Sequence, residues 1–501
     1  MSIWSRSRLA PSKHGAYFEV LSALGRDGYP PPASQPASDG CPICHLNRRG
    51  ISRYLDALSY ENVNDPGVRA ILRAYRGFCS HHAWQFLEET RDGLGTAIIY
   101  RDVVSSLLRA MPVSKVASIG RSLALPAVGR REGHSHRPPE VSDALVERLS
   151  PQGSCPACTS LAESTWLYLD TLLVHLFDGE MQSRYLSSAG LCLPHLALAA
   201  ARLPSRQGLD ILATPYLDRF VRQNGESTAG RLGAPTSLTA ALAGQPAAVW
   251  PEQHRRSGLP AEVVAESIRR EAGRVRVEEG DGCPICQAAS LAVDAWLADL
   301  PSLLEREPQW QELIAQARGL CNRHAWRLSQ LAPLAAVGRV WRPVAALVGE
   351  KLRSAPSTQE EPGPKLWSVL ALGRDSAARR QALALAEHLG PQTECPACQY
   401  QAAMEAAVTT RLLEGREERL AGLCLPHFLL ALRLPAGAQR RASLVSRQAE
   451  VWQDLYADLD RYVYKHDYRF RDLPWGKEID SPSRAVALVA GAKGVRGVRN
   501  S

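Results

Sequence analysis

The 501-residue sequence lacks any long apolar run: no stretch of about 18 uncharged apolar residues occurs, and a membrane-spanning helix needs one of that length. The first 20 residues, MSIWSRSRLAPSKHGAYFEV, also lack the apolar centre of a secretory signal. We therefore expect no membrane partner and a cytoplasmic location. Because thiols stay reduced in the cytoplasm, cysteines there bind metals more often than they form disulfides.

Signals for β-structure are scarce as well. The sequence has few strand-like alternations of polar and apolar residues and few Asn-Gly turns. Apolar residues instead recur at helical spacing. In SLAESTWLYLDTLLVHLF (residues 160–177), one face of a 3.6-residue period carries Leu161, Tyr168, Leu169, Leu172 and Leu176. These patterns predict an all-α protein.

The chain has an excess of basic residues but no long basic block. Lys and Arg number 59 against 51 Asp and Glu, which gives a net charge of +8. The densest basic runs are short and lie at residues 129–137, 254–256, 439–441 and 493–499. Short, scattered runs are typical of solvated surfaces, so nucleic-acid binding stays an alternative that the charge does not favour.

No cysteine lies outside one repeated pattern. All 12 cysteines belong to C-P-x-C followed by G-x-C-x-x-H, and the pattern occurs four times. We predict that each copy forms one metal site from its own two half-motifs. In chain order the predicted sites are Cys41, Cys44, Cys79 and His82; Cys155, Cys158, Cys192 and His195; Cys283, Cys286, Cys321 and His324; and Cys395, Cys398, Cys424 and His427.

Two kinds of copy alternate along the chain. Copies one and three read CPIC and then GFCSHHAW or GLCNRHAW, whereas copies two and four read CPAC and then AGLCLPH. The offsets between like copies agree, since 283 − 41 = 242 and 395 − 155 = 240. This regularity predicts a tandem duplication of a two-module helical unit, with four metal-stapled modules. The predicted segments are an N-terminal segment (1–40), module 1 (41–112), a linker or helix (113–154), module 2 (155–226), an inter-half segment (227–282), module 3 (283–353), a second linker or helix (354–394), module 4 with a C-terminal motif (395–481) and a tail (482–501).

The ligand set and its spacing indicate zinc. Three thiolates and one imidazole are a closed tetrahedral set of structural zinc sites. A proline directly after the first cysteine suits the first position of a helix, so that cysteine would cap the helix. Each site would then join two helix N-termini, whose positive dipole ends favour thiolates. We predict four zinc ions per chain, with iron–sulfur clusters as the alternative.

Two other chemistries of the CxxC motif fit less well. A thiol redox protein is an alternative, but a thioredoxin-like motif needs a βαβ context and leaves the third cysteine and the histidine without a role. Haem attachment is suggested by CPICH at residues 41–45. It is excluded because the other copies place Thr159, Gln287 and Gln399 where the first has His45.

Two stretches differ between the halves and are candidates for a functional surface. The stretch at residues 60–69 contributes Asn62, Asn64 and Asp65, although Asp65 also suits the cap of a helix that begins at Pro66. Near the C-terminus a second stretch mixes ionisable and aromatic groups. A role in tying down the C-terminal segment is favoured there over acid–base chemistry. Its candidates are Lys465, His466, Asp467, Tyr468, Arg469, Arg471 and Trp475.

Together these motifs resemble an uncharacterised bacterial family of helical zinc-binding proteins, a domain of unknown function. The family's pattern is CPxC, ENVNDPGVR, GFCxxHAW, GLCxxH and KHDYRFRDxPWG. It is found here at residues 41–44, 61–69, 77–84, 190–195 and 465–476. The second half lacks the Asn-rich stretch in copy three, and the first half lacks the C-terminal motif. The resemblance implies a metal-binding helical protein of the bacterial cytoplasm and no particular reaction.

The sequence as a whole predicts a binding or scaffold protein with a protein partner. Four small helical units would each bury too little apolar surface alone, and a structural metal would compensate for that. A row of such units offers an extended surface for a partner. The pattern provides no catalytic residue, so it favours a non-enzyme without deciding the question.

Overall fold

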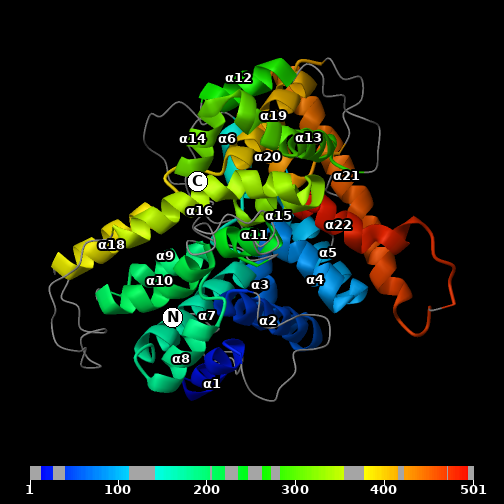
Figure 1. Cartoon of the computed structure of the whole chain (residues 1–501). Helices are drawn as coiled ribbons and strands as arrows, with labels where there is room; N and C mark the ends of the chain where they lie inside the picture. Colours follow the sequence, from blue (N-terminus) through cyan, green and yellow to red (C-terminus); the bar gives the residue numbers. More distant parts are fainter. Residues whose placement is uncertain are drawn as a thin grey trace, which may run out of the picture.

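The computed structural model describes residues 13–25, 40–111, 141–203, 206–220, 235–245, 262–271, 282–354, 377–415, 422–470 and 472–494. Over these residues every regular element is a helix, so the prediction of an all-α protein is confirmed (Figure 1). Within the same residues, no helix is both long enough and apolar enough to cross a membrane.

The first half contains twelve described elements. They are α1 (Lys13–Ala23), α2 (Pro42–Ala57), the π-helix η2 (Leu58–Asn62), α3 (Pro66–Tyr75), α4 (Ser80–Thr90), α5 (Gly93–Ala110), α6 (Val141–Leu149), α7 (Pro156–Val174), α8 (Gly179–Ser187), α9 (Leu193–Ala200), α10 (Arg206–Phe220) and α11 (Pro235–Ala243).

The second half repeats most of this order. Its described elements are α12 (Glu262–Glu271), α13 (Pro284–Arg306), α14 (Pro308–Gln316), α15 (Asn322–Leu331), α16 (Leu334–Arg353), α18 (Ala377–Leu389), α19 (Pro396–Leu413), α20 (Leu425–Arg433), α21 (Ala438–Lys465), the 3-10 helix η6 (Lys477–Asp480) and α22 (Ser481–Ala490). Helices α2 to α5 thus correspond to α13 to α16, and α7 corresponds to α19.

Within each half, the two helices that begin at C-P-x-C pack against each other. Helix α2 lies along α7, and α13 lies along α19. In the first pair the amide of Asn47 donates a hydrogen bond of 2.8 Å to the hydroxyl of Thr165, and both side chains are buried. The face of α7 predicted from helical spacing is buried, including Tyr168 and Leu172. These helix pairs set the positions of the cysteines at their N-termini.

The two halves exchange their last helices. Helix α22, from the second half, packs on α4 and α5 of the first half; α11, from the first half, packs on α15 and α16 of the second. Other contacts between the halves come in matching pairs: α21 with α5 and α10 with α16, then α6 with α20 and α18 with α9. Figure 1 shows α22 beside α4 and α5, far along the chain from them. The chain is therefore arranged like a symmetric dimer joined into one polypeptide.

Each exchanged helix ends in a glycine that holds it to the other half. Gly244 after α11 and Gly491 after α22 have positive φ angles of 82° and 87°. The indole of Trp326 donates a hydrogen bond of 2.9 Å to the Gly244 carbonyl, and that of Trp84 donates one of 2.9 Å to the Gly491 carbonyl. The sequences PTSLTAALAG (235–244) and PSRAVALVAG (482–491) match without a gap. This repeat carries no cysteine and was not among the predicted ones.

Two hydrophobic cores result, and each contains helices of both halves. One core includes Cys41, Cys44 and Cys192 of the first half together with Cys395 and Cys398 of the second. The other includes Cys155 of the first half together with Cys283, Cys286 and Cys424 of the second. The halves are thus interdependent in packing. The boundaries predicted for the individual modules stay a prediction.

Candidate metal centres

The sixteen predicted ligands come together in four compact groups of three cysteines and one histidine. In each group the ligand atoms all lie within 4.8 Å of one another, so each group could hold a metal ion. We name them by half and by position along the chain. The first outer group is Cys41, Cys44, Cys192 and His195, and the first inner group is Cys79, His82, Cys155 and Cys158; the second outer group is Cys283, Cys286, Cys424 and His427, and the second inner group is Cys321, His324, Cys395 and Cys398.

The predicted grouping of these residues is wrong. Every C-P-x-C pair meets a Cys-x-x-His pair of the neighbouring copy, so Cys41 and Cys44 meet Cys192 and His195 instead of Cys79 and His82. Spacing could not reveal this, because each half-motif is a separate helix start and supplies two ligands wherever its partner comes from. The packing of α2 on α7 decides the pairing. The alternation of C-P-x-C and Cys-x-x-His half-motifs along each half also allows the first to pair with the last and the second with the third.

Each group joins two helix N-termini, as predicted. In the first outer group Cys41 is the N-cap of α2 and Cys192 is the N-cap of α9. Pro42 and Pro194 lie in the first turns of these helices. His195 lies three residues after Cys192, and its Nδ1 is 3.3 Å from the Cys192 Sγ. Unpaired N–H groups and the helix dipole therefore surround the sulfur atoms with positive potential.

Glycine two residues before the third cysteine is required by the backbone at three of the four groups. Gly77, Gly190 and Gly319 have φ angles of 93°, 70° and 97°, which other residues adopt at a cost. A Cβ on Gly319 would also lie 2.1 Å from the ring of Trp341. The chain can therefore reverse sharply before Cys321 only because this position has no side chain.

The distances between ligand atoms fit one tetrahedral ion. Sulfur atoms of opposite half-motifs are 3.7 Å apart for Cys44 and Cys192, and 3.6 Å apart for Cys321 and Cys398. Zinc–sulfur bonds of about 2.3 Å in a tetrahedron would separate two sulfurs by about 3.8 Å. In the first outer group the Nδ1 of His195 lies 3.2 Å from the Cys41 Sγ. Each histidine thus presents Nδ1 to the sulfurs.

Without a cation these buried thiols and imidazoles perturb one another strongly. Burial raises the pKa of Cys44 and of Cys192 well above the ordinary value for a thiol. Hydrogen bonds from Cys155 and Cys158 hold the pKa of Cys79 well below it. Burial lowers the pKa of His82, but the Cys79 and Cys155 sulfurs more than offset this and raise it to about 10. Negative charge thus collects on sulfur in a dry site, where a divalent cation would neutralise it.

The outer and inner groups differ in exposure. All four residues of each outer group are buried, whereas Cys79 and Cys158 of the first inner group and Cys321 of the second are partly exposed. The outer groups are also closed by the segments that follow the exchanged helices. The backbone of Gln245 hydrogen-bonds to Cys44, and a Cβ on Gly491 would lie 3.9 Å from the sulfurs of Cys286 and Cys424.

One histidine has a carboxylate behind it. The Glu405 carboxylate lies 3.6 Å from Nε2 of His427, whose Nδ1 faces the sulfurs. Gln401 donates a hydrogen bond of 2.6 Å to Glu405 and so orients it. The equivalent of Glu405 in the first half is Thr165, since 405 − 165 = 240. A carboxylate in this place makes a ligating imidazole more basic and fixes its orientation.

The Asn-rich stretch supplies no member of the four groups, and its side chains mostly form hydrogen bonds with neighbouring helix ends. The Asp65 carboxylate accepts a hydrogen bond of 2.8 Å from the N–H of Val68, so Asp65 caps α3 as the plainer interpretation predicted. Asn62 donates a hydrogen bond of 3.1 Å to the carbonyl of Ala57 within its own helix. Asn64 is exposed.

The C-terminal stretch forms an arm that continues from the end of α21. Lys465 pairs with Glu478, which is buried, and donates a hydrogen bond of 2.5 Å to the Pro474 carbonyl. The rings of Tyr462, His466 and Trp475 pack against one another, with centroid distances of 4.5 to 5.3 Å. These contacts fit the favoured structural role.

The acid–base alternative for this arm lacks its key contact. Asp467 forms an ion pair with Arg469, and Nδ1 of His466 faces the Tyr462 carbonyl at 2.8 Å. The pair with Arg469 lowers the pKa of Asp467 to about 2, so this side chain is a carboxylate at neutral pH. Tyr468 is exposed, and Arg471 lies outside the described residues.

We predict that oxidation will report the crossed pairing directly. When the metal-free protein is oxidised under native conditions, disulfides should form between the half-motif sulfurs 3.6 to 3.7 Å apart. These sulfurs are in van der Waals contact and need a small shift to reach the bond length of about 2.05 Å. Peptide mapping by mass spectrometry should detect Cys44–Cys192, Cys79–Cys158, Cys286–Cys424 and Cys321–Cys398. Disulfides within one C-P-x-C pair are compatible with either grouping and do not distinguish between them. Recovery of Cys44–Cys79 or Cys158–Cys192 instead would contradict the grouping.

We also predict that Glu405→Gln weakens metal binding at the second outer group alone. Loss of the carboxylate behind His427 should reduce affinity there by about 10- to 100-fold. Competition with a chromophoric chelator should therefore resolve one weakened metal per chain. The matched control is Glu350→Gln on the exposed side of α16, which should leave the titration unchanged. Equal weakening in both variants would argue against a role for Glu405.

Part of this chain is similar to a protein described as uncharacterised. The "uncharacterized 23.9 kDa protein in xynA 3′ region" of Caldicellulosiruptor sp. (strain Rt8B.4) is 41% identical over 68 residues. The match covers 14% of this chain and 32% of that protein. That protein therefore has about 212 residues (68/0.32), which is close to the length of one half of this chain. No solved structure matches.

The predicted resemblance to an uncharacterised family is confirmed for the first half. Residues 34–221 contain the first outer and the first inner group, and hence the complete crossed arrangement of one half. This region matches the model of a family of unknown function, DUF6062.

Proposed function

We propose that this protein binds four zinc ions, each in a closed three-cysteine, one-histidine site, and that the metals have a structural role. The observation that carries this proposal is the compactness of the four groups, whose ligand atoms lie within 4.8 Å of one another. Four protein ligands complete a tetrahedral shell and leave no position for water or substrate. The sites therefore support folding and assembly of the two cores instead of catalysis at the metal.

The geometry favours a single ion over an iron–sulfur cluster. A [4Fe–4S] cluster is held by four ligands on four different iron atoms, which spreads the ligand atoms apart. Sulfurs separated by 3.6 to 3.7 Å suit ligands that share one ion. Soft thiolates with one imidazole in a tetrahedron suit zinc among the common metals.

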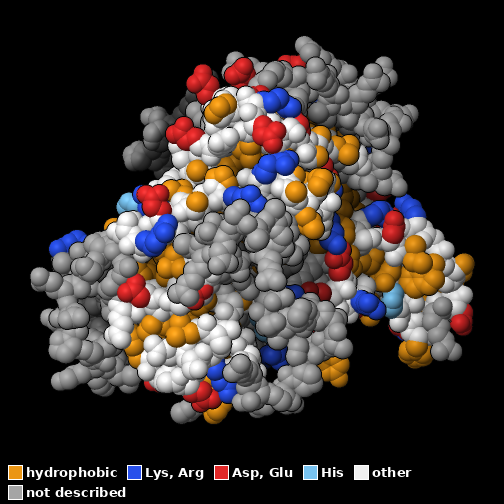
Figure 2. Space-filling view, in the orientation of Figure 1, with side chains coloured by type: hydrophobic (Ala, Val, Ile, Leu, Met, Phe, Trp, Pro, Cys, Tyr) orange, Lys and Arg blue, Asp and Glu red, His pale blue; other side chains and the backbone are white. Residues whose placement is uncertain are grey.

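We further propose that the protein binds a protein partner through the arm at residues 464–479. Five large apolar or aromatic side chains are exposed on this short segment: Tyr464, Tyr468, Leu473, Trp475 and Ile479. Figure 2 shows hydrophobic side chains gathered on the projection at the right of the molecule, on the side where Figure 1 shows α21 and α22. Clustered exposed aromatic groups on a projecting segment are typical of protein interfaces.

The arm is rigid enough to present these side chains. Its base is anchored on Asp458, which is buried in α21 and lies 3.0 Å from Arg484 and 3.2 Å from Arg461. Its two ends are joined by the pair of Lys465 with buried Glu478. A partner would therefore meet an ordered surface and would not have to order a loose chain on binding.

Nucleic-acid binding has less support. Of the four basic runs, those at residues 129–137 and 254–256 lie outside the described residues. In the third, Arg440 donates a hydrogen bond to the Leu412 carbonyl. In the fourth, Lys493 pairs with Glu88. The described basic residues of these runs thus have partners within the protein.

Elemental analysis of the purified protein should give four zinc per chain and a colourless solution. Cys192→Ser should reduce this to three, because the first outer group loses a ligand, and should destabilise the core that contains it. The control Ser183→Ala, at an exposed position of α8, should keep four. Four metals in Cys192→Ser would contradict the ligand assignment. A brown protein that absorbs at about 400 nm would contradict the zinc assignment and indicate an iron–sulfur cluster.

Photo-crosslinking should locate the partner surface. A photoreactive phenylalanine at position 468 should form a protein adduct in cells, because Tyr468 is 81% exposed on the arm. The same residue at position 60 is the control, since Tyr60 is 93% exposed but lies off the arm. We expect an adduct only from position 468. Adducts of equal yield from both positions, or none from position 468, would exclude the arm as the docking surface.

A further inference from the structure

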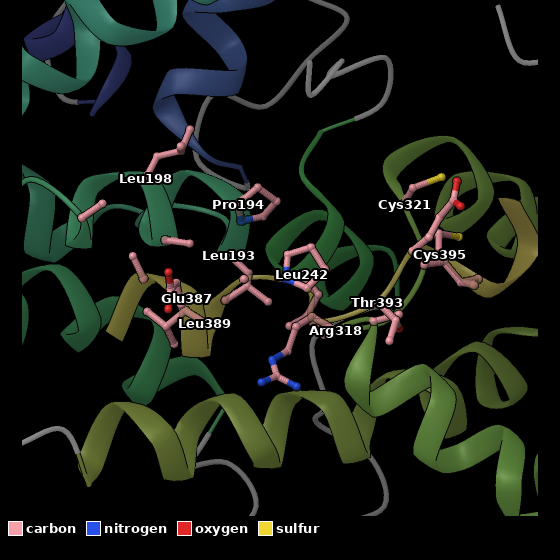
Figure 3. Close-up of a pocket in the computed structure, with 18 of the residues that line it drawn as sticks. Leu193, Pro194, Leu198, Leu242, Arg318, Cys321, Glu387, Leu389, Thr393 and Cys395 are labelled. Carbon is pink, nitrogen blue, oxygen red and sulfur yellow. The ribbon is translucent and has the colours of Figure 1, made fainter. Parts of the chain in front are cut away.

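A cavity of about 570 Å³ lies at one of the two matching interfaces between the halves. One wall is formed by α7 and α9 of the first half, with Trp166, Pro194 and Leu198. The facing wall is formed by α18 and the segment before α19 of the second half, with Leu389 and Pro391. Figure 3 shows side chains from these elements facing one space. Its volume is in the range of small-molecule sites.

The lining is mainly apolar. Of the 23 lining residues, the charged ones are Arg318, Glu387 and Glu394. The Arg318 guanidinium already donates hydrogen bonds to the carbonyls of His388 and Ala315, at 2.7 Å each. The guanidinium therefore links the turn before Cys321 to the end of α18, and its N–H groups do not need an acidic ligand as a hydrogen-bond partner.

Comparison with the matching interface indicates that this cavity is built by small residues. Ala197 on α9 and Ala386 on α18 line it. At the other interface, Leu429 is equivalent to Ala197, with the same offset of 232 as His427 and His195. Val146 is equivalent to Ala386, since 386 − 146 = 240, and both Leu429 and Val146 are buried.

The loops at the two interfaces differ in both directions. Leu320 and Gly390 line the cavity, where the other interface has buried Phe78 and the larger Ser150. Trp166, Thr393 and Glu394 are larger than their equivalents, which are Ala406, Gly153 and Ser154. The Trp166 ring is covered by the Arg202 guanidinium at 4.0 Å. Relative to the other interface as an internal reference, the facing helices α9 and α18 thus carry smaller side chains at the cavity.

One metal centre borders the cavity. Cys321, Cys395 and Cys398 of the second inner group all contribute to its wall. Leu193 and Pro194, from the first turn of α9 in the first outer group, line the opposite side. A molecule in the cavity would contact three cysteines of the second inner group and would cover that group from solvent.

We propose that this cavity is a binding site for an uncharged, mainly apolar small molecule, and that its occupancy shields the metal of the second inner group. The site itself follows from the cavity and its lining. The shielding rests in addition on the proposed zinc function.

Nile red, a neutral dye that fluoresces in apolar surroundings, is a suitable probe of the full-length protein. We expect one dye per chain. The double variant Ala197→Leu, Ala386→Val introduces the side chains of the other interface and should weaken dye binding by about tenfold or more. Ala70→Leu on the exposed side of α3 is the matched control and should bind the dye like the wild type.

A second variant covers the case in which the double variant fails to fold. Leu383→Glu places a charge at the rim, where Leu383 is 43% exposed, and should weaken dye binding without disturbing the packed interface. Wild-type protein that does not bind the dye, or dye binding unchanged in the folded variants, would overturn the proposal.

Metal release to a chelator gives an independent readout. Bound Nile red should slow the release of one metal of the four, and should have no such effect in Leu383→Glu. Unchanged release of all the metals would overturn the shielding. If the protein held no zinc at all, dye binding and its loss in the variants would still test the site by itself.

Discussion

Concentrating three thiols and an imidazole within 4.8 Å inside a protein is the constraint on which the rest of this structure depends. Thiolates in an apolar core are costly unless positive charge surrounds them. The chain supplies part of that charge with two helix N-termini per group, which is why a cysteine occupies the N-cap position at α2, α4, α7 and α9 and again at their equivalents. Because these helices must start at the same point, their directions and packing partners are largely determined.

The exchanged helices extend this constraint from each group to the whole molecule. The segment after α11 contacts Cys44 of the first outer group and accepts the indole hydrogen bond of Trp326, beside the second inner group. The segment after α22 does the same between the second outer group and Trp84. Each core therefore contains an outer group of one half and an inner group of the other. Loss of one metal would therefore destabilise a core that contains helices of both halves.

Much of this could be predicted from the sequence, and the remainder depends on long-range packing. The all-helical class, the sixteen ligands and the helix starts at Cys41 and its equivalents follow from local residue patterns, because capping and ligand chemistry act over a few residues. The grouping of the ligands depends on which helices pack together, and spacing does not encode that. The exchange of α11 and α22 was missed because it is marked only by a glycine and small apolar residues.

The crossed grouping nests one chain closure inside another. The inner group joins Cys79 to Cys158, which closes 79 residues, and the outer group joins Cys44 to Cys192 around it, which closes 148. Taken independently, the longer loop would cost about 0.6 kcal/mol more in chain entropy. Once the inner group has closed, however, the outer half-motifs are separated only by the two flanking segments, from Cys44 to Cys79 (79 − 44 = 35) and from Cys158 to Cys192 (192 − 158 = 34). Assembly from the inside outwards is therefore the least costly order, and the buried outer groups complete each half last.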